Sequence, residues 1–205
     1  MLIMGSIYSN QPRSEQLYFR KVGEVMKTRT ITFLGFGIAL FVALSMCLRV
    51  PVFENYYLCL GYIVMTIYVW NFAWYEGAVV GFFGVILYCM IGALGFNGMP
   101  GWAVGNFFIG LILGVAIKKI RTIKSKVLQV TLVVIAAITA SFIGIEIIKS
   151  LIDSVIVGQP VLVRAAKNTT SFVSDAFVIV ASLPICLATK KVAKELRYGA
   201  EDHLS

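Results

Sequence analysis

The sequence predicts an all-α integral membrane protein with six transmembrane helices and both termini in the cytoplasm. Hydrophobic residues make up 59% of the 205 residues and charged residues only 14%, whereas roughly a quarter of the residues of a soluble domain are charged. The mean hydropathy is +0.88, and apolar runs occupy nearly everything from Ile31 to Thr189. This pattern leaves no polar stretch long enough for a catalytic domain outside the bilayer.

Six segments are apolar enough, at ~20 residues each, to cross the hydrocarbon core of a membrane. They are residues 30–48, 58–75, 77–96, 101–117, 127–157 and 170–189. Since little more than Glu76 and Gly77 separates the second from the third, five helices is the alternative count. The chain then divides into a cytoplasmic N-terminal extension (1–29), the membrane bundle (30–190) and a cytoplasmic tail (191–205), and Met26 is a second plausible start.

The lysines and arginines predict the orientation of these helices in the cell membrane. They gather in residues 13–29, 118–126 and 190–197, at the ends of apolar segments. Cytoplasmic loops carry an excess of such cations, and an even number of spans places both termini on that side. We therefore attribute the net charge of +8 to cations that mark the cytoplasmic ends of the helices, and not to a surface for binding nucleic acid. The outer connections are then the loop "RVPVFENYY", the turn "FNGMPGW" and a longer connection from about Asp153 to Asn168.

Motifs for metal binding or catalysis are not found in the sequence. The four cysteines stand singly in or beside apolar runs, without metal-ligand spacing, and we expect them to be buried apolar residues. The one histidine, His203, lies in the polar tail, and the sequence holds no HExxH, GxSxG or P-loop motif. The sequence thus predicts neither an enzyme nor a resident cofactor.

Small residues recur every four positions in the first helix, at Gly35, Ala39 and Ala43. Residues at this spacing share one helix face and let another helix approach closely in lipid. The face fits either docking of a partner protein or ordinary packing inside the bundle.

The stretch "GFNGMPGWAVGNFFIGLILG", residues 95–114, is rich in glycine for a membrane segment. Asn97 to Pro100 predicts an outward turn, and Pro100 suits the first turn of a helix. Trp102 and Asn106 are one turn apart on one face, and an amide at that depth needs a hydrogen-bond partner that lipid cannot supply. They form a candidate ligand site, although Trp102 also fits an interfacial anchor.

Further polar residues converge on the outer side and are candidate ligand contacts beside an apolar pocket. Together with Trp102 and Asn106, the candidates are Arg49, Glu54, Tyr57, Asn97, Arg164, Asn168 and Asp175. Within the fifth helix, Glu146, Lys149 and Asp153 have the spacing of a local ion-pair ladder. We expect Asp175 about one turn inside the outer boundary, where an ionisable group otherwise marks a substrate or proton path.

Two runs carry a resemblance to a known family: "RVPVFENYYLCLGYIVMTIYVWNFAWYEGAVVGFFGVI" and "PGWAVGNFFIGLILGVAIKK". The pattern resembles the substrate-binding S components of energy-coupling factor (ECF) vitamin transporters, over residues 27 to 190. The resemblance implies a six-helix subunit that captures a vitamin between the outer loops and helices 4 to 6. It also implies docking through an alanine-x-x-x-alanine motif, matched by Ala39 and Ala43, onto a membrane T subunit coupled to two cytoplasmic ATPases. The subunit would topple in the membrane to release its cargo, while the ATPase chains hydrolyse ATP.

The vitamin is left open by the sequence. The first outer loop and the helices after it are similar to flavin-type S components, but "YCMIGALGF" replaces the polar, charged end expected there. Riboflavin, cobalamin, folate, pantothenate and a queuosine precursor remain candidates. The alternative function is a proton-coupled secondary transporter of a small organic solute, with Glu146 or Asp175 as proton carrier; an intramembrane enzyme and a ligand-free scaffold are further alternatives.

Overall fold

The computed structural model describes the backbone of residues 13–47, 50–53, 56–92 and 99–198, and side chains within 28–47, 58–92, 100–193 and at 195. The chain divides into two units, Met1–Phe36 and Gly37–Ser205. Helix α2 (Arg13–Cys47) begins in the first unit and ends in the second.

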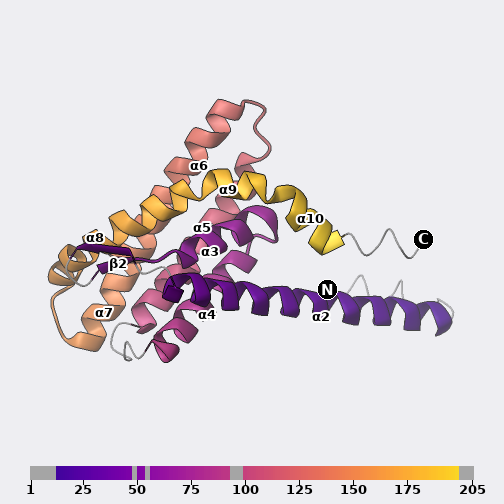
Figure 1. Cartoon of the computed structure of the whole chain (residues 1–205), viewed down its shortest axis with the longest axis horizontal. Helices are drawn as coiled ribbons and strands as arrows, with labels where there is room; N and C mark the ends of the chain where they lie inside the picture. Colours follow the sequence, from indigo (N-terminus) through magenta and orange to yellow (C-terminus); the bar gives the residue numbers. More distant parts are fainter. Residues whose placement is uncertain (1–12, 48–49, 54–55, 93–98, 199–205) are drawn as a thin grey trace, which may run out of the picture. The chain divides into compact units, whose positions relative to one another are not determined.

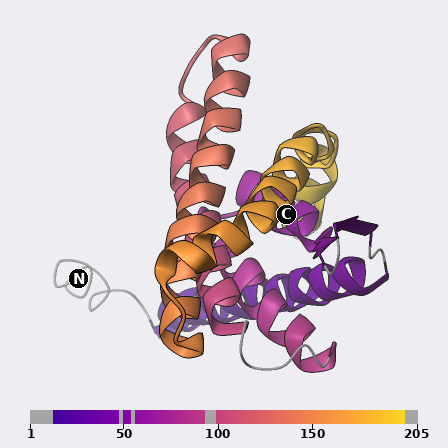
Figure 2. The ribbon, with the colours of Figure 1, turned by 90° about the vertical axis from the view of Figure 1, so that its left-hand side faces the viewer.

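The second unit is built mainly of helices (Figure 1). After α2 come α3 (Gly61–Asn71), α4 (Glu76–Ile91) and α5 (Met99–Ile120). A long helical segment then runs through α6 (Lys126–Ser141), the π-helix η2 (Phe142–Lys149) and α7 (Ser150–Val157). It is followed by α8 (Val161–Ala181), α9 (Leu183–Ala188) and α10 (Lys190–Tyr198). Figure 2 shows α5 running beside the α6–η2–α7 segment.

Four helical segments are long and apolar enough to cross a membrane: Thr28–Cys47, Pro100–Ile120, Lys126–Val157 and Val161–Ala188. They support the prediction of a helical membrane protein. The predicted segments 58–75 and 77–96 instead contain the shorter helices α3 and α4, of 11 and 16 residues. At 1.5 Å per residue, α3 is only about 16 Å long, against a hydrocarbon core of about 30 Å. The described residues therefore give four spans by length, where the sequence predicted six.

A short antiparallel strand pair lies where the sequence predicted an outer loop. Strand β1 (Val50–Phe53) pairs with β2 (Tyr56–Leu58), with Val50 opposite Leu58. The β-branched and aromatic residues of these strands favour extended backbone. The pairing satisfies backbone groups that an irregular loop would leave without partners.

The connection before the last long helix is much shorter than predicted. Helix α7 ends at Val157, and its C-cap Gly158 has a φ of +69°, in the left-handed region that favours glycine. Pro160 directly precedes α8, which begins at Val161. Arg164 and Asn168 therefore lie on a helix and not in a loop, which corrects the sequence prediction. Asp175 lies 14 residues after the start of α8, because this helix begins earlier than the predicted start at about residue 170.

The glycines of α5 allow two close helix contacts. A Cβ at Gly105 would lie 2.6 Å from the carbonyl oxygen of Gly144 in η2. A Cβ at Gly110 would lie 2.5 Å from the Cα of Ala78 in α4. The absent side chains let the α5 backbone approach η2 on one face and α4 on another, as small residues do in membrane bundles.

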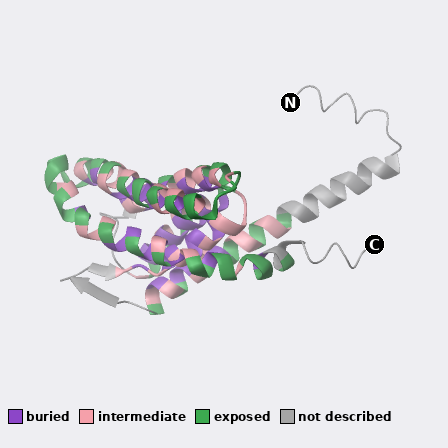
Figure 3. Cartoon of the chain, turned by 90° about the horizontal axis from the view of Figure 1, so that it is seen from above, coloured by how far each residue is buried: buried purple, intermediate pink, exposed green. Residues whose placement is uncertain are grey.

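Large apolar side chains are exposed along the outer face of the long segment from α6 to α7. They include Val130, Ile138, Leu151 and Val155, and Figure 3 shows exposed and buried residues alternating along the helices. Such a surface is stable in lipid and not in water. Of the cysteines, Cys59, Cys89 and Cys186 are buried as expected, whereas Cys47 is exposed.

We expect Gly114→Ala to destabilise the bundle by about 2 kcal/mol, because overpacking a tight contact costs ~1–3 kcal/mol. A Cβ at this position would collide with the backbone carbonyl oxygen of Trp74, which cannot move aside as a flexible side chain does. Thermal unfolding in detergent measures the loss. The control is Val115→Ala in the same helix, where the side chain is 40% exposed; equal unfolding midpoints for the two variants would contradict the close contact.

Candidate functional site

The hydroxyl of Tyr62 joins three helices through buried hydrogen bonds. Tyr62 is on α3, and its hydroxyl lies 2.7 Å from Oδ1 of Asn106 on α5 and 2.8 Å from Oδ2 of Asp175 on α8. Trp102, one turn before Asn106, donates its Nε1 hydrogen to the same hydroxyl at 3.0 Å. These four residues, the Tyr62 cluster, gather polar groups that lipid could not satisfy.

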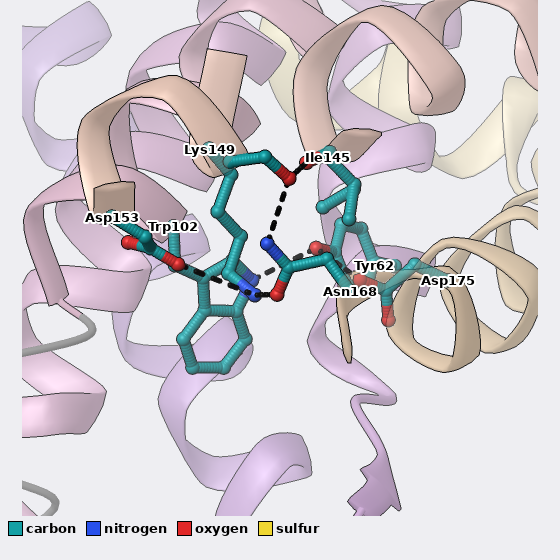
Figure 4. A network of polar contacts seen from close by, with 8 residues as sticks. Tyr62, Trp102, Ile145, Lys149, Asp153, Asn168 and Asp175 are labelled. Atoms are coloured by element: carbon teal, nitrogen blue, oxygen red, sulfur yellow. Dashed lines mark hydrogen bonds and ion pairs between the residues drawn. The ribbon is translucent and has the colours of Figure 1, made fainter. Parts of the chain in front are cut away.

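A second polar cluster centres on Lys149, at the end of η2 (Figure 4). Its ammonium donates to Oδ1 of Asn168 at 2.6 Å and lies 4.0 Å from Oδ2 of Asp153. The amide nitrogen of Asn168 donates to Ser150 at 2.9 Å, and the Ser150 hydroxyl donates to the carbonyl of Ile145 at 3.3 Å. In this Lys149 cluster the ammonium, the amide nitrogen and the hydroxyl are hydrogen-bond donors, and the amide and backbone carbonyl oxygens are acceptors.

Local helix geometry places these side chains. Asn168 and Asp175 are seven residues apart on α8, two turns along one face. Trp102 and Asn106 are four apart on α5, and so share a face as well. Lys149 ends η2, which is a π-helix, a form that often occurs at functional sites. The hydroxyl of Ser150, the next residue, donates a hydrogen bond to the carbonyl oxygen of Ile145, five residues before it. The two clusters therefore lie along neighbouring parts of α8.

Several buried polar atoms near these clusters have no hydrogen-bond partner among the described residues. They are Nδ2 of Asn106, Oδ1 of Asp153, Oε1 of Glu146 and Nε of Arg164. Leaving such an atom unpaired costs about 1–3 kcal/mol. Buried groups of this kind are suited to binding a ligand that completes their hydrogen bonds.

The structure brings together part of the predicted site. Trp102, Asn106 and Asp175 meet at Tyr62, and Asn168 lies in the Lys149 cluster. Trp102 is half-buried, with its ring against Tyr88 at 5.7 Å between centroids, edge to face. Arg164 is half-buried on α8.

The remaining candidates lie outside the described residues or side chains. Arg49, Glu54 and Asn97 are outside the described residues, and Tyr57 is described only as backbone in β2. Residues 93–98, which include Asn97 and Gly98 of the predicted outward turn, are outside them too, whereas Met99 and Pro100 of that turn begin α5.

Four side chains of the clusters were not among the predicted ligand contacts: Tyr62, Lys149, Ser150 and Asp153. Lys149 was expected only in an ion-pair ladder, of which the contact with Asp153 is present at 4.0 Å. An ionisable residue inside an apolar run was the signal that could have identified it. Tyr62 stands in the run "GYIVMTIYVW", where an aromatic residue usually belongs to the core.

The small-residue face of α2 divides between the two units. Gly35 belongs to the first unit. Ala39 and Ala43 belong to the second and are exposed, whereas Phe41 and Ser45 are buried, with Ser45 3.3 Å from the sulfur of Cys59. Within the second unit, therefore, Ala39 and Ala43 are not used to pack α2 against the bundle.

Comparisons with known proteins agree with this architecture. The chain matches the family model of the ECF-type riboflavin transporter, S component, over residues 25–191. A solved structure titled as the S component for biotin from an ECF-type ABC transporter superposes with a TM-score of 0.55, at 16% identity, covering 80% of this chain and 92% of that one. No match was found among curated proteins. The low identity of the solved structure shows a shared fold, and the family match covers most of the chain: this protein belongs to the ECF-type riboflavin transporter S component family and is a membrane transport component for vitamin uptake.

Proposed function

We propose that this protein is the riboflavin-binding subunit of an ATP-driven ECF importer in the plasma membrane. The observation that supports it most is the burial of the Tyr62 and Lys149 clusters between helices whose outer surfaces are apolar. Buried polar groups of this kind inside a membrane bundle usually serve a ligand or ion path. Family membership makes riboflavin the first ligand to test, although the sequence "YCMIGALGF" had counted against it.

The chemistry of the two clusters fits a flat heteroaromatic vitamin that carries polar edges. Trp102 provides an aromatic surface beside an amide, Asn106, and ligand sites combine apolar and aromatic walls with a few placed polar groups. Lys149 and Asn168 supply charge and amide groups that suit carbonyl oxygens or hydroxyls. Riboflavin has a planar ring with carbonyl and N–H groups and a hydroxylated side chain. The ligand roles of Arg49, Glu54, Tyr57, Asn97 and Arg164 belong to the same proposal.

The energising partners in this proposal are a membrane T subunit and two cytoplasmic ATPases, which would hydrolyse the ATP. The exposed positions of Ala39 and Ala43 on α2 support a docking face there, because small residues allow close helix contact in lipid. The proposal keeps six membrane crossings, with α3 and α4 as short ones, and both termini in the cytoplasm. The cation-rich segments 118–126 and 190–197 support that orientation.

We expect Asn106→Ala to weaken riboflavin binding about tenfold or more, because one ligand hydrogen bond in a buried site is worth on the order of 1–2 kcal/mol. Isothermal titration calorimetry of the purified chain in detergent measures the affinity. Asn71→Ala is the matched control, since the Asn71 amide is on the same bundle but binds Cys186 and Thr189 at the end of α9. Equal affinities of the parent and Asn106→Ala would remove Asn106 from the site.

The ligand itself is identified by mass spectrometry of small molecules released from gently purified protein, with a detergent-only control. Stoichiometric riboflavin supports the proposal, and another vitamin keeps the binding-subunit function but replaces the ligand. An empty protein that also ignores a panel of vitamins, and that transports solute with a proton gradient in vesicles without ATPase chains, would instead support the proton-coupled transporter.

A further inference from the structure

The hydroxyl of Tyr62 has more partners than its single proton can serve. Trp102 Nε1 can only donate, so it occupies a lone pair of the Tyr62 oxygen. Asn106 Oδ1 and Asp175 Oδ2, at 2.7 and 2.8 Å, are both placed to accept from Tyr62. A phenol donates one hydrogen bond, so one of these two contacts must have the opposite direction.

Two arrangements satisfy the Tyr62 hydroxyl. With Asp175 ionised, Tyr62 donates to the carboxylate, and the Asn106 amide is turned by 180° so that Nδ2 donates to Tyr62. With Asp175 protonated, the carboxyl donates to Tyr62, which then donates to Oδ1 of Asn106. The two ends of an amide have nearly the same shape, so the distance of 2.7 Å fits both arrangements.

In each arrangement one polar atom of the Asn106 amide has no partner among the described residues. It is the carbonyl oxygen in the first and the NH₂ group in the second, and the second corresponds to the unpartnered Nδ2 of this structure. Asn106 is completely buried, so this atom cannot turn to bulk water. The Asn168 amide differs, because Lys149 and Ser150 occupy both of its ends.

We propose that Tyr62 is a positioning residue that sets which end of the Asn106 amide, NH₂ donor or carbonyl acceptor, the site offers to its ligand. The inference rests on the proposed function, since it concerns the same ligand. It identifies the ligand chemistry as a hydrogen-bonding group, acceptor or donor, on the edge of a planar ring that contacts Trp102. Among the described residues, the charged or titratable groups that interact with Asp175 include Tyr62, Lys149 on η2 and Cys59 before α3.

Tyr62→Phe separates this role from core packing. The phenyl ring keeps the edge-to-face contact with Phe41, at 6.3 Å between centroids, and only the hydroxyl is lost. Without that hydroxyl, neither end of the Asn106 amide is held. Tyr62→Phe should therefore weaken ligand binding only when the Asn106 amide is present.

A double-mutant cycle tests the proposal, with riboflavin as the probe and calorimetry on the full chain. We expect Tyr62→Phe and Asn106→Ala each to weaken binding about tenfold, and the double variant to bind no more weakly than Asn106→Ala alone, because coupled residues are not additive. Tyr68→Phe, which removes a hydroxyl from the same helix beside Gly37, should leave the affinity unchanged. If Tyr62→Phe weakened binding only by loosening the site, its effect would be independent of Asn106. The two losses of affinity would then multiply to about a hundredfold in the double variant.

Each result decides the question. The positioning role would be overturned if the two losses of affinity multiplied, or if Tyr62→Phe bound riboflavin like the parent. In either case, riboflavin binding by the parent would still support the proposed function. A parent that binds neither riboflavin nor other vitamins would overturn the proposed function itself. Should Tyr62→Phe not fold, Asp175→Asn replaces it in the cycle, since Asp175 contacts the Tyr62 hydroxyl and would act on Asn106 through it; its effect should also vanish beside Asn106→Ala.

Discussion

Lys149→Met is expected to destabilise the protein by about 3 kcal/mol and to abolish ligand binding. The side chains of Lys149 and Asp153 are only 14% and 6% exposed and lie 4.0 Å apart. Removing one partner of a buried ion pair leaves the other charge uncompensated, which costs about 3–5 kcal/mol. Asn168 also loses the donor on its carbonyl oxygen. Thermal unfolding and riboflavin calorimetry measure the two effects.

A second substitution separates stability from binding at this position. In Lys149→Met with Asp153→Asn, the carboxylate that formed the ion pair with Lys149 is removed as well, so we expect part of the stability to return while the affinity stays low. Asp153→Asn alone is the matched control and keeps the lysine. Recovery of binding together with stability would show that Lys149 serves the fold and is not a ligand contact.

Ala39→Trp is expected to abolish vitamin uptake while leaving ligand affinity unchanged. Ala39 is exposed on α2, one turn before Ala43, so an indole there would disturb no packing within the second unit. It would, however, hold a partner helix several ångströms away, and close approach is the main source of packing energy between helices in lipid. Co-purification with the T subunit and uptake by cells measure assembly; calorimetry measures binding.

The control for bulk alone is Val130→Trp, which is on a different helix, α6, and is 58% exposed. Uptake should be normal in this variant. If Ala39→Trp assembles and transports like Val130→Trp, the docking face lies elsewhere on the chain.

Hydropathy alone predicted the long apolar helices, because each of these segments has at least twenty residues and is apolar over most of its length. It failed at the break between α3 and α4, where Phe72, Ala73, Trp74 and Tyr75 continue the apolar run although the helix has ended. A change of backbone direction leaves no mark on hydropathy when the turn is itself apolar. The opposite error occurred in α8, whose first residues include charged and amide side chains and were read as a loop.

The sequence predicted several residues of the candidate site, but it predicted contacts only between neighbours along one helix. The four-residue spacing placed Trp102 and Asn106 on one face, and both contact the same hydroxyl. The contact between Tyr62 and Asp175 joins residues 113 positions apart. Such a contact depends on how helices pack, and residue spacing within one helix carries no information about it. For the same reason the partner of the predicted Asn106 amide could not be named from the sequence.

The short helices α3 and α4 have a consequence for the surrounding membrane. Helices of about 16 and 24 Å stand in one unit with spans of more than twenty residues. A bilayer adapts to a short hydrophobic segment by thinning beside it, at a modest free-energy cost per ångström. With α3 and α4 as the short crossings of the proposed function, the protein should be bordered by lipid of unequal thickness, and lipids with shorter acyl chains should gather beside α3 and α4.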